Sequence, residues 1–153
     1  MSRRDQIRMT PEEAEAFLEE GRTVTIATVG RDGWPHLMPL WYVLRDGTIH
    51  AWTYAASQKV RNLERDPRCT LQVEAGEEYA QLRGVMLKAR AHIHRDVEDV
   101  WGVGAELAVR YGGASITPDV EAAMRKQAAK RVGLEFAVSE TASWDHRKLG
   151  GTY

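Results

Sequence analysis

The residues best suited to chemistry lie in one short segment, TYAASQKVRNLERDPRCTLQV, residues 53–73. Ser57 and Lys59 stand at the start of a short basic helix, directly after the aromatic residues Trp52 and Tyr54. A helix start exposes unpaired N–H groups and the positive end of the helix dipole, so a hydroxyl and a cation complete a phosphate site there. Ser57 can be both N-cap and ligand, and Lys59 supplies the charge. The segment therefore indicates a phosphate held beside a flat ring.

The same segment also fits an ordinary solvated helix. In that alternative Val60 and Leu63 pack inward, and the polar residues Gln58, Lys59, Arg61 and Arg65 face water. On this segment alone the two interpretations are equally supported. Four aromatic residues shift the balance toward a ring site, because they gather near the ends of the two strands before the helix. They are Trp41, Tyr42, Trp52 and Tyr54, and aromatic core packing stays the alternative for each one singly.

Other motifs support a function less well. His92 and His94 share one strand face, which is half of a metal site, but the cations Lys88 and Arg90 on that face oppose a divalent ion. We therefore expect no metal and interpret this strand as solvated or anion-facing. Cys69 has no acid or histidine partner evident in the sequence, so we interpret it as a small strand residue.

The elements that must position the segment can be read from turn and cap signals. Thr10-Pro11 with Glu13 is a capping-box pattern, and Gly21 suits the end of that helix. Two Arg-Asp-Gly turns then separate three extended runs, which predicts a three-stranded meander. These runs are residues 24–29, 34–44 and 48–54.

The second half continues with strands and two helices. Asp66-Pro67 ends the basic helix, and alternation of apolar and polar residues predicts further strands. The predicted strands are residues 70–74, 84–95 and 133–139, and the predicted helices are residues 97–111 and 118–131. Sequential antiparallel strands without a strand-helix-strand repeat predict an α+β fold that is mainly β, an antiparallel six-stranded barrel with peripheral helices.

Size and charge limit the classes of function. The chain has 153 residues with 43% hydrophobic content, which predicts a single domain over residues 1–153. A formal net charge of -1 gives no global basic field, so we expect no nucleic-acid or membrane partner. With one cysteine and neither a secretory signal nor a long apolar span in the sequence, we expect a cytoplasmic protein.

Three motifs together resemble a known family. They are Trp34-Pro35-His36-Leu37-Met38-Pro39-Leu40-Trp41, then Trp52-Thr53-Tyr54, then Ser57-Gln58-Lys59-Val60-Arg61-Asn62-Leu63 with Asp66-Pro67-Arg68. This order is similar to the pyridoxamine 5′-phosphate oxidase-like, FMN-binding split β-barrel family, from the first helix to the last strand. The ending Ser143-Trp144-Asp145-His146-Arg147-Lys148-Leu149 resembles actinobacterial members that use the deazaflavin coenzyme F420.

The resemblance implies a homodimer with two cofactor sites at the interface. Met38, Pro39, Leu40 and Trp41 would run along the ring edge, Trp52 and Thr53 would flank the phosphate-bearing chain, and Ser57, Gln58, Lys59 and Asn62 would hold the phosphate. The partner subunit would supply Gln72, Tyr79 and Trp144, with His146 also placed on the substrate or partner side. Residues 38–42 contain no basic residue, which argues against oxidation of vitamin B6.

The expected function is an F420-dependent oxidoreductase that passes hydride from reduced deazaflavin to a conjugated small molecule. The cofactor carries the hydride chemistry, and the protein binds it, orients it and excludes water. His36, Tyr42 or His146 could donate a proton, and nothing in the sequence selects one. Two alternatives stay open: an FMN-dependent oxidoreductase of the same fold, and a non-catalytic flavin or deazaflavin carrier.

Overall fold

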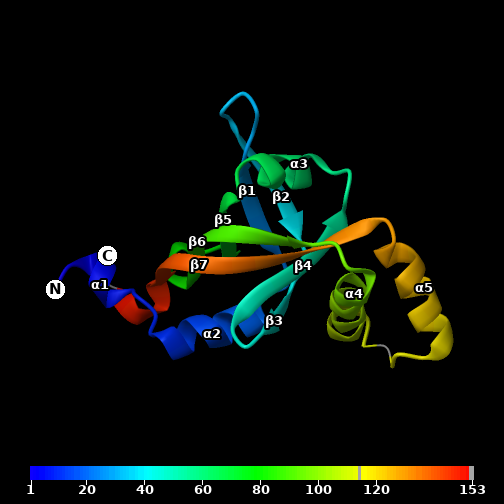
Figure 1. Cartoon of the computed structure of the whole chain (residues 1–153). Coiled ribbons are helices and arrows are strands. Elements are labelled where there is room, and N and C mark those ends of the chain that lie inside the picture. The colour runs from blue at the N-terminus through cyan, green and yellow to red at the C-terminus, as the bar shows by residue number, and fades with distance from the viewer. Residues whose placement is uncertain (114, 152–153) are drawn as a thin grey trace.

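The computed structural model describes residues 1–113 and 115–151, and its centre is one antiparallel sheet. Seven strands lie in the order β2-β1-β5-β6-β7-β4-β3 (Figure 1). The strands are β1 (Val24–Val29), β2 (Pro35–Leu40), β3 (Val43–Arg45), β4 (Thr48–Tyr54), β5 (Arg68–Ala75), β6 (Arg83–His94) and β7 (Arg131–Asp145). The helices are α1 (Arg3–Gln6), α2 (Pro11–Glu20), α3 (Gln58–Arg65), α4 (Val97–Gly112) and α5 (Pro118–Ala128), with 3-10 turns η1 (Tyr79–Gln81) and η2 (His146–Leu149).

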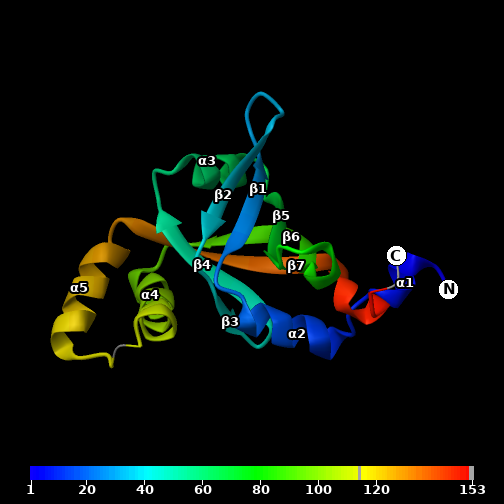
Figure 2. The ribbon, with the colours of Figure 1, turned by 180° about the vertical axis from the view of Figure 1, so that it is seen from behind.

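The helices lie around the sheet at separate places. In both views α3 crosses one end of β1 and β2, whereas α2 lies on the other side of the sheet (Figures 1 and 2). The α4–α5 pair forms one end of the molecule, and the two chain termini meet near α1 at the opposite end. The basic helix is therefore held apart from the C-terminal turn η2 of the same chain.

The strand count differs from the six that the sequence predicts. Residues 34–44 form two strands instead of one, because the chain leaves the sheet at Trp41 and Tyr42. Tyr42 donates its N–H to the Tyr111 hydroxyl (3.1 Å), and its carbonyl accepts from Arg110 (2.9 Å), so partners in α4 replace the strand ladder there. Both hairpins of the expected meander form, since β2 pairs with β1 and β3 pairs with β4, but the middle run is divided between the two edges of the sheet.

The sheet is strongly curled but open. β2 and β3 lie at opposite edges of the strand order, yet only Trp41 and Tyr42 separate them along the chain. Three Cα steps of about 3.8 Å each must bridge the two edges, so the sheet bends until its edges approach. Within the described residues no ladder joins β2 to β3. The α+β fold with an antiparallel sheet and peripheral helices is confirmed, whereas a six-stranded barrel is not.

The last strand is longer than predicted. The sequence places its end at residue 139 because polar residues follow, but β7 pairs with β6 as far as Asp145. Lys88 and Glu140 face each other across this ladder, with 2.9 Å between Nζ and the Oε2 carboxylate oxygen. Cross-strand pairing therefore keeps a polar stretch in the sheet, and it places Trp144 opposite Gly84.

Local signals predict several helix ends correctly, although α5 ends at Ala128 and not near residue 131, where β7 begins. The Thr10 hydroxyl accepts from the Glu13 N–H (3.2 Å), and the Glu13 carboxylate accepts from the Thr10 N–H (2.7 Å), as in the expected capping box. Asp96 caps α4 through its side chain, and Gly113 ends that helix with φ 61°. These caps fix where α2 and α4 begin and where α4 ends.

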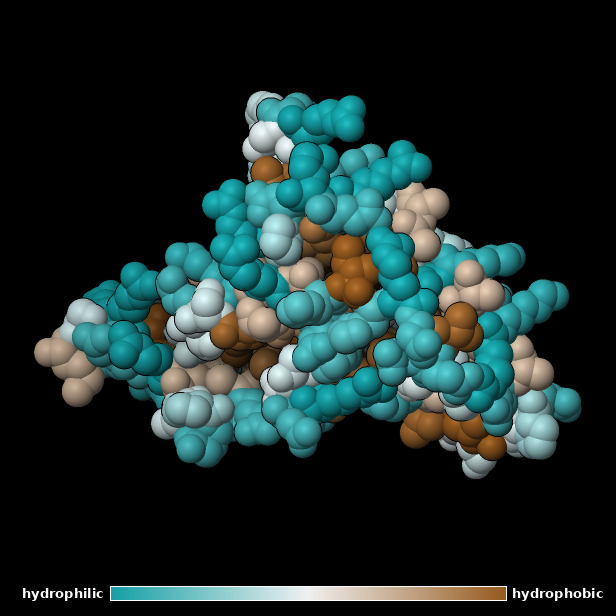
Figure 3. Space-filling view, viewed as in Figure 1, coloured by the Kyte–Doolittle hydropathy of each residue, from teal (hydrophilic) through white to brown (hydrophobic). Residues whose placement is uncertain are grey.

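The core lies inside the curl of the sheet, under α2 and α3. Its members are buried aliphatic and aromatic side chains such as Val24, Ile26, Leu71, Leu134 and Phe136. Hydrophilic atoms cover most of the face shown in Figure 3, and apolar side chains reach that surface in several separate places. None of the helices in residues 1–113 and 115–151 combines the length and apolarity needed to span a membrane.

Candidate functional site

The start of α3 carries a serine hydroxyl with no protein partner. Ser57 occupies the N-cap position with an extended backbone (φ -69°, ψ 154°), as the sequence predicts, but its side chain makes no capping hydrogen bond. The Ser57 Oγ atom is buried, and no donor or acceptor in the described residues contacts it. A buried hydroxyl without a partner costs free energy, so this atom indicates a ligand that completes its hydrogen bonds.

Lys59 is buried beside this helix start. Its side chain is only 7% exposed, and its Nζ donates to the Thr53 hydroxyl at 3.0 Å. Among the described residues, no carboxylate lies within ion-pair distance of this ammonium group. Burial lowers the pKa of Lys59, because water no longer stabilises the charged form. The alternative in which Lys59 faces water is therefore wrong.

Asn62 fixes the position of α3. Its Nδ2 donates to the Thr28 hydroxyl (3.0 Å), and its Oδ1 accepts from Gln58 Nε2 (2.9 Å) and from Arg65 (3.4 Å). Both ends of this fully buried amide are thus occupied by protein groups. The arrangement suits a residue that holds the helix against β1, with Gln58 turned toward Asn62.

A cleft opens between the β1–β2 hairpin and α3. Its volume is about 470 Å³, and its walls include Trp34, His36, Gln58 and Asn62. His36 Nδ1 is a second buried polar atom without a partner in the described chain. The two buried polar atoms without a partner in the described chain, His36 Nδ1 on β2 and Ser57 Oγ at the start of α3, therefore lie on the two elements that border the cleft.

The strand β2 offers a free backbone edge next to the helix. It pairs with β1 alone among the described strands, so its other edge keeps unpaired N–H and C=O groups. Pro39 and Leu40 lie on this strand, Met38 is 40% exposed, and Trp41 follows at 59% exposure. The Trp41 ring stacks on Tyr111 of α4, with centroids 4.5 Å apart and planes 5° from parallel. A flat ring could meet both backbone groups and apolar side chains here.

Trp52 and Thr53 point to opposite faces of β4, as consecutive strand residues must. Thr53 faces Lys59, whereas the Trp52 ring lies against Gly104 of α4, where an added Cβ would come within 2.4 Å of it. The Arg131 guanidinium lies over the same ring at 4.7 Å. The structure thus places Thr53 beside Lys59 and turns Trp52 to the opposite face, a difference that the alternation of strand residues already signals.

The residues expected from a partner subunit form a second group. The Tyr79 and His146 rings meet edge to face at 4.6 Å, and His146 Nδ1 lies 2.9 Å from the Tyr79 carbonyl oxygen. Trp144 covers Gly84, and Gln72 is exposed on β5. The turn η2, which carries His146 and packs on η1 with Tyr79, lies near α1, away from α3 (Figure 1). One chain therefore does not bring these two rings to its own Lys59.

Of the three proton-donor candidates, Tyr42 is excluded by its surroundings. It is fully buried, its hydroxyl donates to the Leu18 carbonyl at 2.6 Å, and burial raises its pKa to about 12. Cys69 is likewise a buried strand residue, with burial raising its pKa to about 12, so its thiol is unreactive as expected.

No metal centre forms around the two strand histidines in residues 1–113 and 115–151. His94 Nε2 instead lies 2.7 Å from the Glu135 carboxylate on the neighbouring strand. Sequence inspection misses this partner because it depends on the pairing of β6 with β7.

The curled sheet and the start of α3, with its buried ammonium group and a hydroxyl left unpaired within the described residues, define an α+β protein with a candidate anion site. A model described as pyridoxamine 5′-phosphate oxidase matches residues 10–145. The chain belongs to this family. Among curated proteins, no match was found.

Solved structures extend the comparison. The conserved hypothetical protein Rv2991 from Mycobacterium tuberculosis is 40% identical, with 100% of this chain and 95% of that chain covered and a TM-score of 0.91. A protein named F420 reductase is 22% identical, with 86% and 98% covered and a TM-score of 0.67. The heme storage protein HutZ from Vibrio cholerae is 20% identical, with 88% and 92% covered and a TM-score of 0.66. The last two likenesses show the shared fold alone.

Proposed function

We propose that the chain is an oxidoreductase that binds the deazaflavin F420 and reduces a conjugated small molecule. The observation that carries this proposal is the buried Lys59 without a carboxylate partner, next to the orphaned Ser57 hydroxyl. Family membership supports a phosphate-bearing, flavin-type cofactor, and the likeness to a protein named F420 reductase favours the deazaflavin.

Different residues of this chain bind the phosphate and the ring of the cofactor. Ser57 and Lys59 take the phosphate, with Thr53 holding the ammonium group in place at 3.0 Å. The free edge of β2 contacts the ring edge through backbone groups, and Trp41 covers it from the side. When bound, the cofactor supplies the hydride transfer, whereas these residues orient it and exclude water.

The proposed active unit is a homodimer. The turn η2 with His146, which contacts Tyr79, lies away from α3 of its own chain (Figure 1), so these two residues, with Gln72 and Trp144, would line the site of a second copy. An exposed apolar row on β2, which includes Leu37 at 58% exposure, supports such an interface.

F420 is expected to bind at least about tenfold more tightly than FMN, a difference of roughly 1.4 kcal/mol. FMN ends in its phosphate, whereas the deazaflavin continues past a phosphodiester to lactate and glutamates, so its anionic tail gains contacts on leaving the site. Arg31, Arg61 and Arg65 line a cleft that also borders Gln58 at the helix start, where such a tail would pass. Competitive fluorescence titration of the two cofactors at low and high salt measures the difference. Added salt should weaken the F420 complex more, because exposed charge contacts are screened.

An Arg61→Gln variant tests the contribution of this basic cleft directly. Arg61 is exposed and has no role in holding α3 on the sheet, so the change should reduce the preference for F420 and leave FMN affinity unchanged. Tighter binding of FMN by the parent protein would remove the deazaflavin assignment and leave the family assignment intact.

If the protein is a dimer, its apparent melting temperature should rise with protein concentration, because association stabilises the folded state. Leu37→Asp should convert the protein to a monomer, because it places a charge in the apolar interface. Val109→Asp is the control, since Val109 is a similarly exposed aliphatic residue (50%) on α4. Light scattering across micromolar concentrations gives the mass, and a parent protein that is already monomeric contradicts the shared site.

A further inference from the structure

The cleft between the β1–β2 hairpin and α3 is lined by two residues that the proposed cofactor contacts leave unused, Trp34 and His36. Its volume is about 470 Å³, and Gln58 and Asn62 line its helix side. Pockets that hold small molecules in proteins commonly have volumes of this order. The hairpin cleft therefore has room for a ring-sized molecule beside the start of α3.

The side chain of His36 lies on the face of β2 that is turned toward α3. His36 is directly opposite Thr28 in the β1–β2 ladder, and direct cross-strand partners share one face of a sheet. Thr28 marks that face, because its hydroxyl accepts from the Asn62 amide of α3 at 3.0 Å. Leu37, the next residue, points to the opposite face. The hairpin cleft and the proposed dimer contact at Leu37 are therefore on opposite faces of β2.

The Nδ1 atom of His36 is buried and has no hydrogen-bond partner in residues 1–113 and 115–151. The neighbouring amide cannot supply one, because Asn62 already donates to Thr28 and accepts from Gln58 and Arg65. A buried nitrogen without a partner costs free energy, which a ligand recovers by forming the missing hydrogen bond. A neutral imidazole nitrogen donates or accepts according to the tautomer, so a hydroxyl or carbonyl oxygen is the matching group.

The hairpin loop that carries Trp34 has a fixed backbone. The Trp34 N–H donates to the Asp32 carboxylate at 3.1 Å, and its carbonyl accepts from the Gly30 N–H at 2.8 Å. A Cβ added at Gly30 would come within 2.8 Å of both Asp32 and Trp34, so the loop is closely packed. Trp34 is nevertheless 74% exposed. The loop thus presents a large flat ring at the rim of the cleft.

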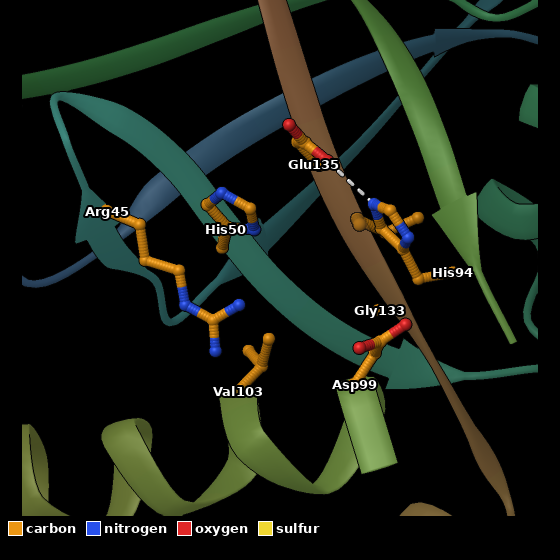
Figure 4. Close-up of a pocket in the computed structure, with 8 residues that line it drawn as sticks. Arg45, His50, His94, Asp99, Val103, Gly133 and Glu135 are labelled. Atoms are coloured by element: carbon orange, nitrogen blue, oxygen red, sulfur yellow. Dashed lines mark hydrogen bonds and ion pairs between the residues drawn. The ribbon is translucent and has the colours of Figure 1, made fainter. Parts of the chain in front are cut away.

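A smaller cavity beside α4 shows what the hairpin cleft has in addition. Its volume is about 120 Å³, and Arg45, His50, His94 and Glu135 reach it (Figure 4). His94 Nε2 lies 2.7 Å from the Glu135 carboxylate, and Arg45 donates to Glu106 at 2.6 Å, so these charges are paired within the chain. This cavity is smaller than usual ligand pockets, and none of its described side chains has a polar atom that is both buried and unpaired. Of the two, the hairpin cleft is the one that fits a ring-sized ligand.

We propose that the hairpin cleft binds the planar, conjugated substrate: the Trp34 ring stacks on the face of the substrate, and His36 Nδ1 forms a hydrogen bond with a hydroxyl or carbonyl oxygen at its edge. Stacking favours any flat ring, whereas a buried nitrogen left unpaired rejects a ring that lacks the oxygen. His36 therefore determines specificity. It lies on the same face of β2 as Met38, which borders the proposed position of the cofactor ring. The role of this ligand as the substrate rests on the proposed function, but its binding can be measured without the cofactor.

The probes 2-naphthol and naphthalene test the cleft, because they share one flat ring system, differ by a single hydroxyl group and accept no hydride. NMR titration of the cofactor-free protein measures both affinities and locates the site. The amide signals of Gly30 and Gly33 in the hairpin loop should move as 2-naphthol is added. Its dissociation constant should be at least about tenfold lower than that of naphthalene, because only 2-naphthol pairs with His36 Nδ1.

Two variants separate the polar contact from the ring contact. His36→Phe keeps a flat ring and removes Nδ1, so the affinity for 2-naphthol should fall about tenfold, to that for naphthalene. Trp34→Ala changes an exposed residue and should weaken the binding of both probes by about fivefold. Trp101→Leu, on α4 and outside the cleft, is the control and should bind both probes as the parent does.

Three results overturn the proposal: equal affinity of the parent for the two probes, an unchanged preference in His36→Phe, or signal shifts confined to residues outside the cleft. If His36→Phe does not fold, the preference of the parent and the loss in Trp34→Ala carry the test. The F420 titration separates this inference from the proposed function. A protein that binds F420 but not 2-naphthol overturns this inference alone, whereas one that binds 2-naphthol here but not F420 keeps the ligand site and overturns the proposed reduction.

Discussion

Replacing Lys59 by methionine is expected to strengthen the ligand-free fold and to weaken cofactor binding at the same time. The ammonium group is buried with a threonine hydroxyl as its partner and no carboxylate within ion-pair distance in the described chain, so methionine removes an uncompensated charge at similar volume. The gain in the free energy of unfolding should be about 1 kcal/mol. A purely structural lysine would give the opposite sign.

The loss of affinity follows from the same charge. A charge-assisted hydrogen bond to a phosphate is worth about 1.5–3 kcal/mol, which is roughly ten- to hundredfold in the dissociation constant. Thermal unfolding with and without added cofactor measures both effects in one experiment. Lys126→Met, an exposed lysine on α5, is the control and should change neither quantity. Equal cofactor affinity in Lys59→Met and the parent would place the phosphate elsewhere.

The pH dependence gives this prediction a second readout. Burial lowers the pKa of Lys59 in the folded protein below its ordinary value of 10.5. At a pH between the lowered pKa of the folded protein and 10.5, Lys59 binds a proton more often in the unfolded chain than in the folded one. The stability of the ligand-free parent therefore rises as the pH rises through this window. Lys59→Met lacks this rise. The stability difference between variant and parent should therefore narrow as the pH approaches 10.5 from below.

Local chemistry explains what the sequence predicts well. The Thr10–Glu13 capping box, the Asp96 cap and the Gly113 helix end depend on neighbouring residues alone, and all three form. The start of α3 was likewise predictable, because Ser57 follows a strand and precedes an amphipathic turn. Ser57 and Lys59, which we propose to hold the phosphate, stand out for the same reason.

Long-range contacts explain what the sequence does not predict. The break at Trp41 and Tyr42 depends on Arg110 and Tyr111, almost seventy residues further along the chain. The burial of Lys59 is equally hidden, because helical periodicity selects Val60 and Leu63 as the inward residues. Thr53 on the adjacent strand β4 is what draws the ammonium group inward.

Arg110→Met is expected to cause a large loss of stability. The guanidinium donates to four main-chain carbonyl oxygens, those of Leu18 (3.3 Å), Glu19 (2.9 Å), Gly21 (2.6 Å) and Tyr42 (2.9 Å). Three of them lie at the C-terminal end of α2, where carbonyl groups have no partner within the helix. The carbon of the guanidinium also lies 4.6 Å from the Tyr42 ring centroid.

Methionine keeps the aliphatic length of Arg110 but removes this donor from the carbonyl oxygens of Glu19 and Gly21, whereas those of Leu18 and Tyr42 still accept from the Tyr42 and Tyr111 hydroxyls. The free energy of unfolding should therefore fall by about 3 kcal/mol. For a chain of this size that corresponds to roughly 6–12 °C in the melting temperature. Arg125→Met is the matched control, because Arg125 also lies over an aromatic ring, that of Trp101, but pairs with the carboxylates of Glu98 and Glu121 on an exposed face. It should barely change the melting temperature. Arg110 also holds Tyr42, which lies between β2 and β3, so its loss should disorder the neighbouring Trp41 and reduce cofactor affinity. A large loss of stability with unchanged affinity would show that the two edges of the sheet are held together without Arg110.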